Sequence, residues 1–372
     1  MVASAAAVST SSTAAAFSTM SSSAKIVQRG FVNRIARGVG LPKTLLDGVD
    51  GFVFDCDGVI WRAGELCDPR IPGVFKQLRA LKKRVFFVTN NSTKPRSVFL
   101  EKLKSLGIDA EPNELYSAAF ACAEYLRLYQ PRLLSTHAVY LIGMSGLEQE
   151  LRQEGINVFG GPSDTAFNER MQKWMSEKVT AAGEKGIFGV FENIPIPGAK
   201  SEAGMTNNAG TSIEKPIGAV VCGFDPTLNY YKVQLAQLCL NEKYNPVKDC
   251  AFIATNPDAV AHITPDCEWA GNGWCVGAIK GCTNREPVYT GKPSSLLMDI
   301  LCKGHGLDRQ RLVMIGDRLD TDILFGLSNR MKTLLVLSGV TTEAEGSESE
   351  TRADYCIDNV GEFFESGTAQ EA

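Results

Sequence analysis

The sequence has few of the side chains that usually bind zinc. Only three histidines occur among 372 residues, and no two of the 11 cysteines form a CxxC pair. Zinc sites are built mainly from histidine and cysteine, so we expect none here. The dispersed cysteines instead indicate reduced thiols that are mostly buried, and their use in redox regulation stays open.

Long apolar runs and long basic runs are also missing. No uninterrupted apolar stretch approaches the ~20 residues that are needed to cross a bilayer. The net charge is −4 and the basic residues form no long run, so neither a membrane nor a nucleic acid is an expected partner. A hydrophobic content of 44% and a charged content of 22% are ordinary for a globular protein. A length of 372 residues predicts two domains.

Acidic residues are absent from the first part of the chain. No acid occurs before Asp47, and residues 1–24 are almost entirely Ala, Ser, Thr and Val. Four basic residues follow: Lys25, Arg29, Arg34 and Arg37. Ser and Thr interrupt the apolar residues throughout, which argues against a secretory signal. This composition predicts an organellar transit peptide and linker over residues 1–45, with a disordered tail as the alternative.

Four aspartates form two short signatures near opposite ends of the remaining chain. The apolar run Phe52-Val53-Phe54 ends in Asp55 and, two residues on, Asp57; the run 312–316 is followed by Asp317 and then Asp322. Buried parallel strands deliver catalytic groups to the carboxyl edge of an open α/β sheet in this way. Carboxylates gathered in one cleft repel unless a cation lies among them, and hard oxygen ligands favour Mg2+. The pattern predicts a metal-assisted phosphoryl-transfer site with an aspartate nucleophile.

Strand-like and helix-like segments alternate from Asp47 on. Strands are predicted over 51–54, 85–88, 138–142, 217–221, 251–254, 311–315 and 333–337. Helices are predicted over 73–83, 97–106, 115–128 and 168–180. This alternation is typical of an α/β protein with a doubly wound parallel sheet.

The simplest partition inserts a smaller α/β domain into a larger one. The core comprises residues 46–135 and 281–372, and the inserted cap comprises residues 136–280. Within the cap, residues 162–215 are rich in Gly, Pro, Asn, Ser and Lys. We expect an amphipathic helix there, followed by a long surface loop.

Four motifs follow one another along the chain. They are Asp55-x-Asp57-Gly58, Thr89-Asn90-Asn91-Ser92, Gly291-Lys292-Pro293 and Gly316-Asp317-x4-Asp322. In this order, with three of them ending predicted strands, they resemble the haloacid dehalogenase superfamily. The resemblance is greatest to its phosphatases with a large α/β cap, the group of plant and algal phosphoglycolate phosphatases and 4-nitrophenylphosphatases. It runs from about Leu46 to the C-terminus and implies a Rossmann-like core with an inserted cap.

The resemblance also implies roles for the four aspartates. Asp55 would attack phosphorus and form an aspartyl-phosphate. Asp57 would protonate the leaving oxygen and then deprotonate the hydrolytic water. Mg2+ would be held by Asp55, Asp317 and the backbone carbonyl of Asp57. Asp322 would support these ligands, or bind the ion directly.

The two middle motifs would bind the phosphoryl group. Thr89 and the amide of Asn90 would contact its oxygens, and Lys292 would supply a positive charge and steady Asp55. Asn91 would contact the substrate, or merely cap the following helix. The plainer alternatives are a strand-end hydroxyl for Thr89 and a solvated loop residue for Lys292.

Specificity is expected from the cap, where His262, Glu268 and Trp269 lie in the turn-rich stretch 255–273. Pyridoxal-phosphate phosphatases of this group use a cap histidine where this sequence has Ala261. The resemblance therefore implies a Mg2+-dependent hydrolase that converts 2-phosphoglycolate to glycolate and phosphate. A pyridoxal-phosphate or broad aryl phosphatase is the first alternative, and a non-catalytic binding protein on the same fold is the second. We expect a location in the chloroplast stroma, with the mitochondrion as the alternative, and a homodimer through the cap.

Overall fold

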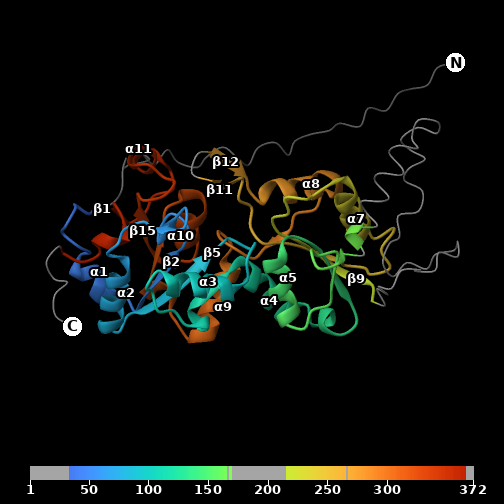
Figure 1. Ribbon diagram of the computed structural model, residues 1–372, viewed down its shortest axis with the longest axis horizontal. Coiled ribbons are helices and arrows are strands. Elements are labelled where there is room, and N and C mark those ends of the chain that lie inside the picture. Colours follow the sequence, from blue (N-terminus) through green and yellow to red (C-terminus); the bar gives the residue numbers. More distant parts are fainter. Residues whose placement is uncertain (1–32, 166, 170–214, 265–266, 366–372) are drawn as a thin grey trace, which may run out of the picture.

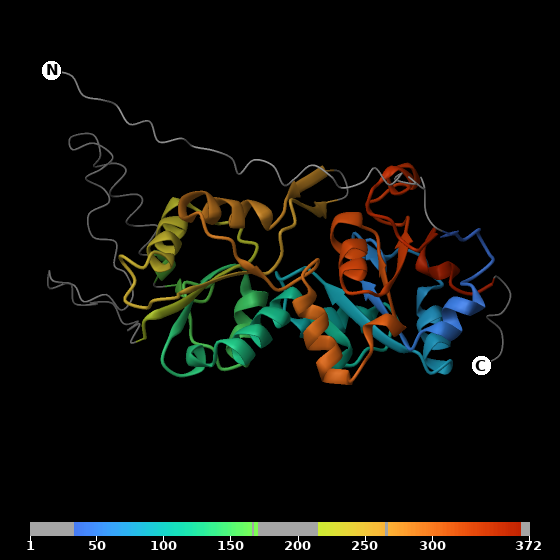
Figure 2. The same ribbon diagram turned by 180° about the vertical axis from the view of Figure 1, so that it is seen from behind.

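The computed structural model describes residues 33–165, 167–169, 215–264 and 267–365. These residues form two parallel sheets that lie at opposite ends of an elongated molecule (Figures 1 and 2). We call the seven-stranded sheet the core sheet and the five-stranded sheet the cap sheet. The α/β fold class, with a cap inserted into a doubly wound core, is confirmed.

The core sheet has the strand order β1-β16-β15-β14-β2-β5-β6, and every neighbouring pair is parallel. Its strands are β1 (Asn33–Arg34), β2 (Gly51–Asp55), β5 (Arg84–Thr89), β6 (Leu115–Ser117), β14 (Leu312–Gly316), β15 (Lys332–Val336) and β16 (Tyr355–Ile357). All five residues of β2 and of β14 are buried. Continuous apolar runs of this kind form central strands because helices cover both faces of the sheet.

Helices cover the two faces of the core sheet. Phe52 and Phe54 of β2 pack on one face with α1 (Lys43–Gly48), α2 (Ile71–Ala80) and α3 (Arg96–Ser105). Val53 packs on the other face. That face is covered by α4 (Ala118–Tyr129), α9 (Ser295–His305) and α10 (Leu324–Ser328). Successive residues of a strand point to opposite faces, so the two layers share the same strands.

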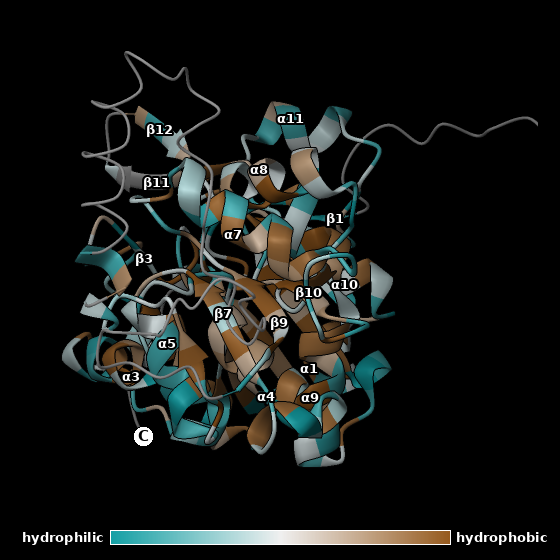
Figure 3. Cartoon of the chain, turned by 90° about the vertical axis from the view of Figure 1, so that its right-hand side faces the viewer, coloured by the Kyte–Doolittle hydropathy of each residue, from teal (hydrophilic) through white to brown (hydrophobic). Residues whose placement is uncertain are grey.

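The cap sheet has the order β13-β10-β9-β7-β8 and is also parallel. Its strands are β7 (Ala138–Ile142), β8 (Val158–Phe159), β9 (Ile217–Cys222), β10 (Ala251–Ala254) and β13 (Val288–Tyr289). Figure 3 shows β7 and β9 as largely apolar strands between helices. Helices α4 and α5 (Ser145–Gln153) cover one face, and α7 (Tyr230–Leu240) and α8 (Gly273–Thr283) cover the other. Helix α4 packs on both sheets and joins them.

Two small antiparallel hairpins extend from this framework. One pairs β3 (Trp61–Arg62) with β4 (Glu65–Leu66) directly after the first motif. The other pairs β11 (Val260–Thr264) with β12 (Cys267–Ala270), within the stretch from which we expected specificity. None of the described helices is long and apolar enough to span a membrane.

Several expectations from the sequence need correction. Residues 115–117 form strand β6, so the helix expected over 115–128 begins at Ala118. Residues 33–45, which the sequence placed with the leader, are part of the fold: β1 pairs with β16, and Leu45 is buried in the core. Strand β13 pairs with cap strand β10, so the proposed domain limit at residue 280 separates it from the sheet that it joins. Most of the helix expected over 168–180, and the loop after it, lie outside the described residues.

Candidate active site

The first, second and fourth motifs meet at the carboxyl edge of the core sheet. Asp55 is the last residue of β2, Thr89 is the last residue of β5, and Asp317 directly follows β14. The strands are neighbours in the order β14-β2-β5, with Ile315 opposite Phe54. The parallel sheet therefore brings together residues that are more than 200 positions apart in the sequence.

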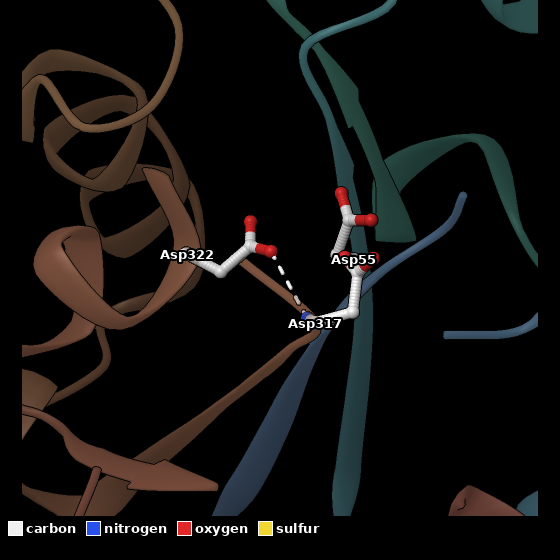
Figure 4. Close-up of side chains that lie close together, drawn as sticks. All are labelled: Asp55, Asp317 and Asp322. Carbon is white, nitrogen blue, oxygen red and sulfur yellow. Dashed lines mark hydrogen bonds between the residues drawn. The ribbon is translucent and has the colours of Figure 1, made fainter. Parts of the chain in front are cut away.

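Three buried carboxylates lie within this edge. Asp55, Asp317 and Asp322 each offer a carboxylate oxygen, and these oxygens lie within 4.8 Å of one another. Figure 4 shows Asp317 beside Asp55 and the Asp322 side chain directed toward Asp317. Only 7%, 2% and 1% of the respective residues is exposed. Three buried acids in so small a volume require positive charge or protons.

The ammonium of Lys292 supplies one positive charge to the cluster. It contacts Oδ1 of Asp55 and lies 2.7 Å from Oδ1 of Asp322. Burial alone would lower the pKa of Lys292, but the charges of Asp322 and Asp55 raise it well above its ordinary value. Lys292 is 2% exposed, so the alternative of a solvated loop residue is wrong.

One cation does not balance three carboxylates. Burial raises the pKa of Asp55 well above its ordinary range, and the charges of Asp322 and Asp317 add to this, while Lys292 opposes it. Burial and the charge of Asp322 raise the pKa of Asp317 to about 7. The cluster is therefore short of positive charge at neutral pH.

The surroundings of Asp317 fit a metal ion. Its Oδ2 accepts the amide N–H of Val340 at 2.8 Å, whereas its buried Oδ1 has no hydrogen-bond partner in the described part of the chain. The backbones of Gly58 and Gly339 lie close to the Asp317 carboxylate. A Cβ at Gly58 would lie 2.3 Å from Oδ2 of Asp317, and a Cβ at Gly339 would lie 1.9 Å from it. A buried orphan oxygen among hard oxygen donors is what a magnesium ion would complete.

The carboxylate of Asp322 accepts hydrogen bonds from three donors of the protein. Its Oδ2 accepts the amide N–H groups of Asp317, at 3.2 Å, and Arg318, at 3.1 Å, and its Oδ1 accepts from Lys292. The single π-helical turn Leu319–Ile323 places it back over the strand end. These contacts agree better with a supporting position than with direct metal ligation.

The second motif forms a compact loop. Thr89 is buried, and its hydroxyl accepts the amide N–H of Asn91 at 3.1 Å. The side chain of Asn91 accepts the amide N–H of Thr93 at 3.0 Å, and helix α3 is capped at Pro95. The alternative in which Asn91 caps the following helix is therefore wrong.

Asn90 joins the second and third motifs. Its side-chain oxygen accepts the amide N–H of Lys292 at 2.8 Å, and its side-chain nitrogen donates to the carbonyl of Lys292 at 3.0 Å. The same nitrogen donates to Asp258 at 3.0 Å, and the carbonyl of Asn90 accepts from Asn256 at 2.8 Å. Asn90 thus fixes the backbone of the lysine and ties it to the loop after cap strand β10.

Comparison with known proteins agrees with this geometry. A family model described as "Haloacid dehalogenase-like hydrolase" matches residues 52–157, and one described as "HAD-hyrolase-like" matches residues 289–363. The chain is 39% identical over 322 residues to phosphoglycolate phosphatase 1A, chloroplastic, of Arabidopsis thaliana, covering 86% of this chain and 78% of that protein. It is 40% identical over 325 residues to phosphoglycolate phosphatase 2 of the same plant, covering 87% and 94%.

The chain belongs to the haloacid dehalogenase-like hydrolases. A p-nitrophenyl phosphatase from Archaeoglobus fulgidus has a similar structure, with a TM-score of 0.63 and 25% identity over 84% of this chain and 97% of that one. Most of the cap sheet lies between the two ranges that the family models match, so the matched residues belong mainly to the core sheet.

Two residues on the cap side of this hydrolase site lie in the turn-rich stretch 255–273, although the sequence did not single them out within it. Asn256 and Asp258 follow β10 and reach the core through Asn90. Burial raises the pKa of Asp258 to about 6, against the opposing effects of Arg318 and Asn90. Arg318 is hydrogen-bonded to Asp320 and lies close enough to Asp258 to act on its pKa.

The cap candidates for specificity are less well placed by the structure. Trp269 lies on β12 and is 46% exposed, and Glu268 beside it is also exposed. The indole N–H of Trp269 donates to Thr264 at 2.9 Å. The side chain of His262 lies outside the described residues.

Proposed function

We propose that this phosphatase is a Mg2+-dependent phosphomonoesterase that hydrolyses 2-phosphoglycolate through an aspartyl-phosphate. The observation that carries the chemistry is the buried cluster of Asp55, Asp317 and Asp322 with Lys292 across it. The two Arabidopsis relatives named phosphoglycolate phosphatase support the substrate.

Mg2+ would be held by Asp55, Asp317 and the backbone carbonyl of Asp57, and when bound it would offset the negative charge of the phosphoryl oxygens. The orphan Oδ1 of Asp317 and the charge deficit of the cluster support this assignment. Asp322 would hold the loop of Asp317 and the ammonium of Lys292 in place.

The reaction then proceeds in two displacements. A carboxylate oxygen of Asp55 attacks phosphorus, the bond from phosphorus to the leaving oxygen breaks, and Asp57 gives that oxygen a proton. In the second step Asp57 takes a proton from water, which attacks phosphorus and releases phosphate and the Asp55 carboxylate. Asp57 is exposed and lies two residues beyond Asp55, and Gly58 with φ 82° makes the turn between strand and hairpin.

Thr89, Asn91 and the backbone amide of Asn90 would bind phosphoryl oxygens, and Lys292 would place its charge beside the group in transfer. Thr89 lies one strand away from Asp55, with Asp55 opposite Val88 in the register. This proximity supports a shared phosphoryl site for the two strand ends.

Discrimination between substrates would come from the cap, because the core residues contact only the phosphoryl group. The test is the ratio of kcat/KM for 2-phosphoglycolate to kcat/KM for pyridoxal phosphate, measured with Mg2+ within a panel of phosphomonoesters. We expect a ratio above one, and a ratio below one would favour the pyridoxal-phosphate alternative. No turnover of any ester would favour the binding protein.

We further propose import into the chloroplast stroma, supported by the acid-free N-terminal composition and by the name of one relative. A reporter fused to residues 1–45 should enter plastids; accumulation in mitochondria would favour the alternative, and retention in the cytosol would contradict both. A homodimer through the cap follows from the family resemblance, and sedimentation equilibrium would measure it.

A further inference from the structure

A tryptophan outside the four motifs holds the side chain of Asp57. The indole N–H of Trp61 donates to Oδ1 of Asp57 at 2.7 Å. Trp61 is only 1% exposed, whereas Asp57 is exposed. The other carboxylate oxygen, Oδ2, accepts no hydrogen bond from the residues that the structure describes. One oxygen is thus tethered to the core, and the other is left without a donor from the described part of the chain.

The loop between the two residues is closed on itself. The amide N–H of Gly58 donates to the carbonyl of Trp61 at 2.8 Å, and the amide N–H of Trp61 donates to the carbonyl of Cys56 at 3.2 Å. Trp61 packs in the core cluster that covers one face of the sheet. Because its ring is fixed by this packing, the direction of its N–H is fixed too, and so is the carboxylate that accepts it.

A lysine lies over the same ring. The ammonium of Lys102, on α3, is 3.9 Å from the centre of the Trp61 ring. Among the described residues Lys102 forms no ion pair, and its ammonium faces the aromatic ring instead. Burial lowers the pKa of Lys102, and the charge of Asp57 opposes this. A cation on the ring face strengthens the packing of the indole, and tryptophan is the best aromatic partner for it.

We propose that Trp61 is a positioning residue that aligns Asp57 for proton transfer to the leaving oxygen, and that Lys102 holds the indole in place. This inference rests on the proposed function, in which Asp57 is the general acid. If Trp61 only stabilised the core, its replacement would lower the activity equally on esters with good and with poor leaving groups. A tryptophan that aligns the acid matters most when the leaving group is a poor one.

The test compares two leaving groups. An alkyl phosphate such as 2-phosphoglycolate needs a proton on its leaving oxygen, whereas 4-nitrophenolate departs as an anion. The value of kcat/KM covers steps up to the departure of the leaving group, so it isolates this difference. General acid–base catalysis contributes about 10²- to 10⁴-fold, and misalignment removes part of that. Trp61→Phe keeps an aromatic ring but lacks the N–H. We therefore expect kcat/KM to fall about 10- to 100-fold for 2-phosphoglycolate and less than about threefold for 4-nitrophenyl phosphate.

Variants of α3 serve as a second, independent measurement. Lys102→Met should shift the ratio of the two kcat/KM values in the same direction, by about 3- to 10-fold. Lys104→Met, at an exposed position of the same helix, should leave the ratio unchanged. Because Lys102 is only half-buried, this pair decides the question even if Trp61→Phe fails to fold.

The outcomes separate the two ideas. If Trp61→Phe or Lys102→Met loses activity equally on both substrates, or on neither, the positioning role is overturned while the proposed function stands. If the wild-type protein hydrolyses neither ester with Mg2+, the proposed function fails, and the role of Trp61 fails with it. A selective loss on the alkyl ester supports both.

Discussion

The charge deficit of the acidic cluster predicts an unusual dependence of stability on pH in the metal-free protein. The pKa of Asp317 is raised to about 7 in the folded state, against about 3.9 for an unperturbed aspartate. Between these values the folded state holds a proton that the unfolded state has lost. Stability is therefore greatest below about pH 4 with respect to this group, and it is lost as the pH rises through about 7. At about 1.4 kcal/mol per pH unit the interval corresponds to about 4 kcal/mol.

The perturbation that tests this is Asp317→Asn. The amide has nearly the same shape and no charge, its oxygen can keep the bond from Val340, and its NH2 can face the neighbouring carboxylates. We expect the variant to be inactive, yet about 2–4 kcal/mol more stable than the wild type in EDTA at pH 8. At pH 5 the unfolded wild type has already lost this proton while the folded wild type keeps it, so the difference should shrink to about 1.5 kcal/mol.

The assay is urea unfolding in EDTA between pH 5 and pH 8, followed by circular dichroism, with a parallel series in Mg2+. Bound metal supplies the missing charge, so Mg2+ should raise wild-type stability most at pH 8 and should not affect Asp317→Asn. Asp320→Asn is the matched control, because Asp320 lies three residues after Asp317, in the π-helical turn, but is exposed. A wild-type stability that is flat from pH 5 to pH 8, or a variant less stable than wild type at pH 8, would refute the reasoning.

Three further predictions concern the nucleophile, the metal and the start of the fold. Asp55→Asn should abolish turnover without unfolding the protein, because an amide cannot attack phosphorus; more than a trace of wild-type rate, without deamidation, would contradict the mechanism. Activity should vanish in EDTA, return with Mg2+ and be inhibited by Ca2+, whose longer bonds misplace the nucleophile; full activity after metal removal would contradict the role of Asp317. Deleting residues 1–32 should leave the unfolding free energy within about 1 kcal/mol, whereas deleting residues 1–45 should cost about 5 kcal/mol or more, because Ile35, Leu41 and Leu45 leave the core; equal urea midpoints would show that residues 33–45 add nothing.

The central strands could be predicted because their sequences allow little else. Runs such as 51–54 and 312–315 are apolar on both faces and end in acids, which suits only a strand covered by helices on both sides. Strand β6 was missed because its three residues lead straight into an alanine-rich helix. Strand β1 was missed because the composition around it is that of a leader, and its place depends on β16, more than 300 residues away.

The site, too, could be predicted only in part from the sequence. Residues at strand ends were predictable, since the edge of a parallel sheet gathers them whatever the loops do. The contacts of the Asn90 side chain with Asp258 and Lys292 span 168 and 202 residues, and no local sequence pattern predicts them. The bond from Trp61 to Asp57 spans only four residues, but it depends on the turn that the backbone bonds of Gly58 and Trp61 close and on the burial of the indole in the core.

Lys292 connects the cap sheet with the nucleophile at the edge of the core sheet. The nucleophile belongs to the core sheet, whereas Lys292 continues the edge strand of the cap sheet: Thr290 and Gly291 donate their amide N–H groups to Ala254 and Thr255 at 3.0 Å and 2.7 Å. The ammonium of Lys292 therefore reaches Asp55 from the cap side, and Asn90, on the core side, binds the backbone of Lys292. The contact between cation and nucleophile therefore depends on how the cap sheet is placed relative to the core. Substrate contacts in the cap can for this reason affect the rate of phosphoryl transfer itself as well as the affinity.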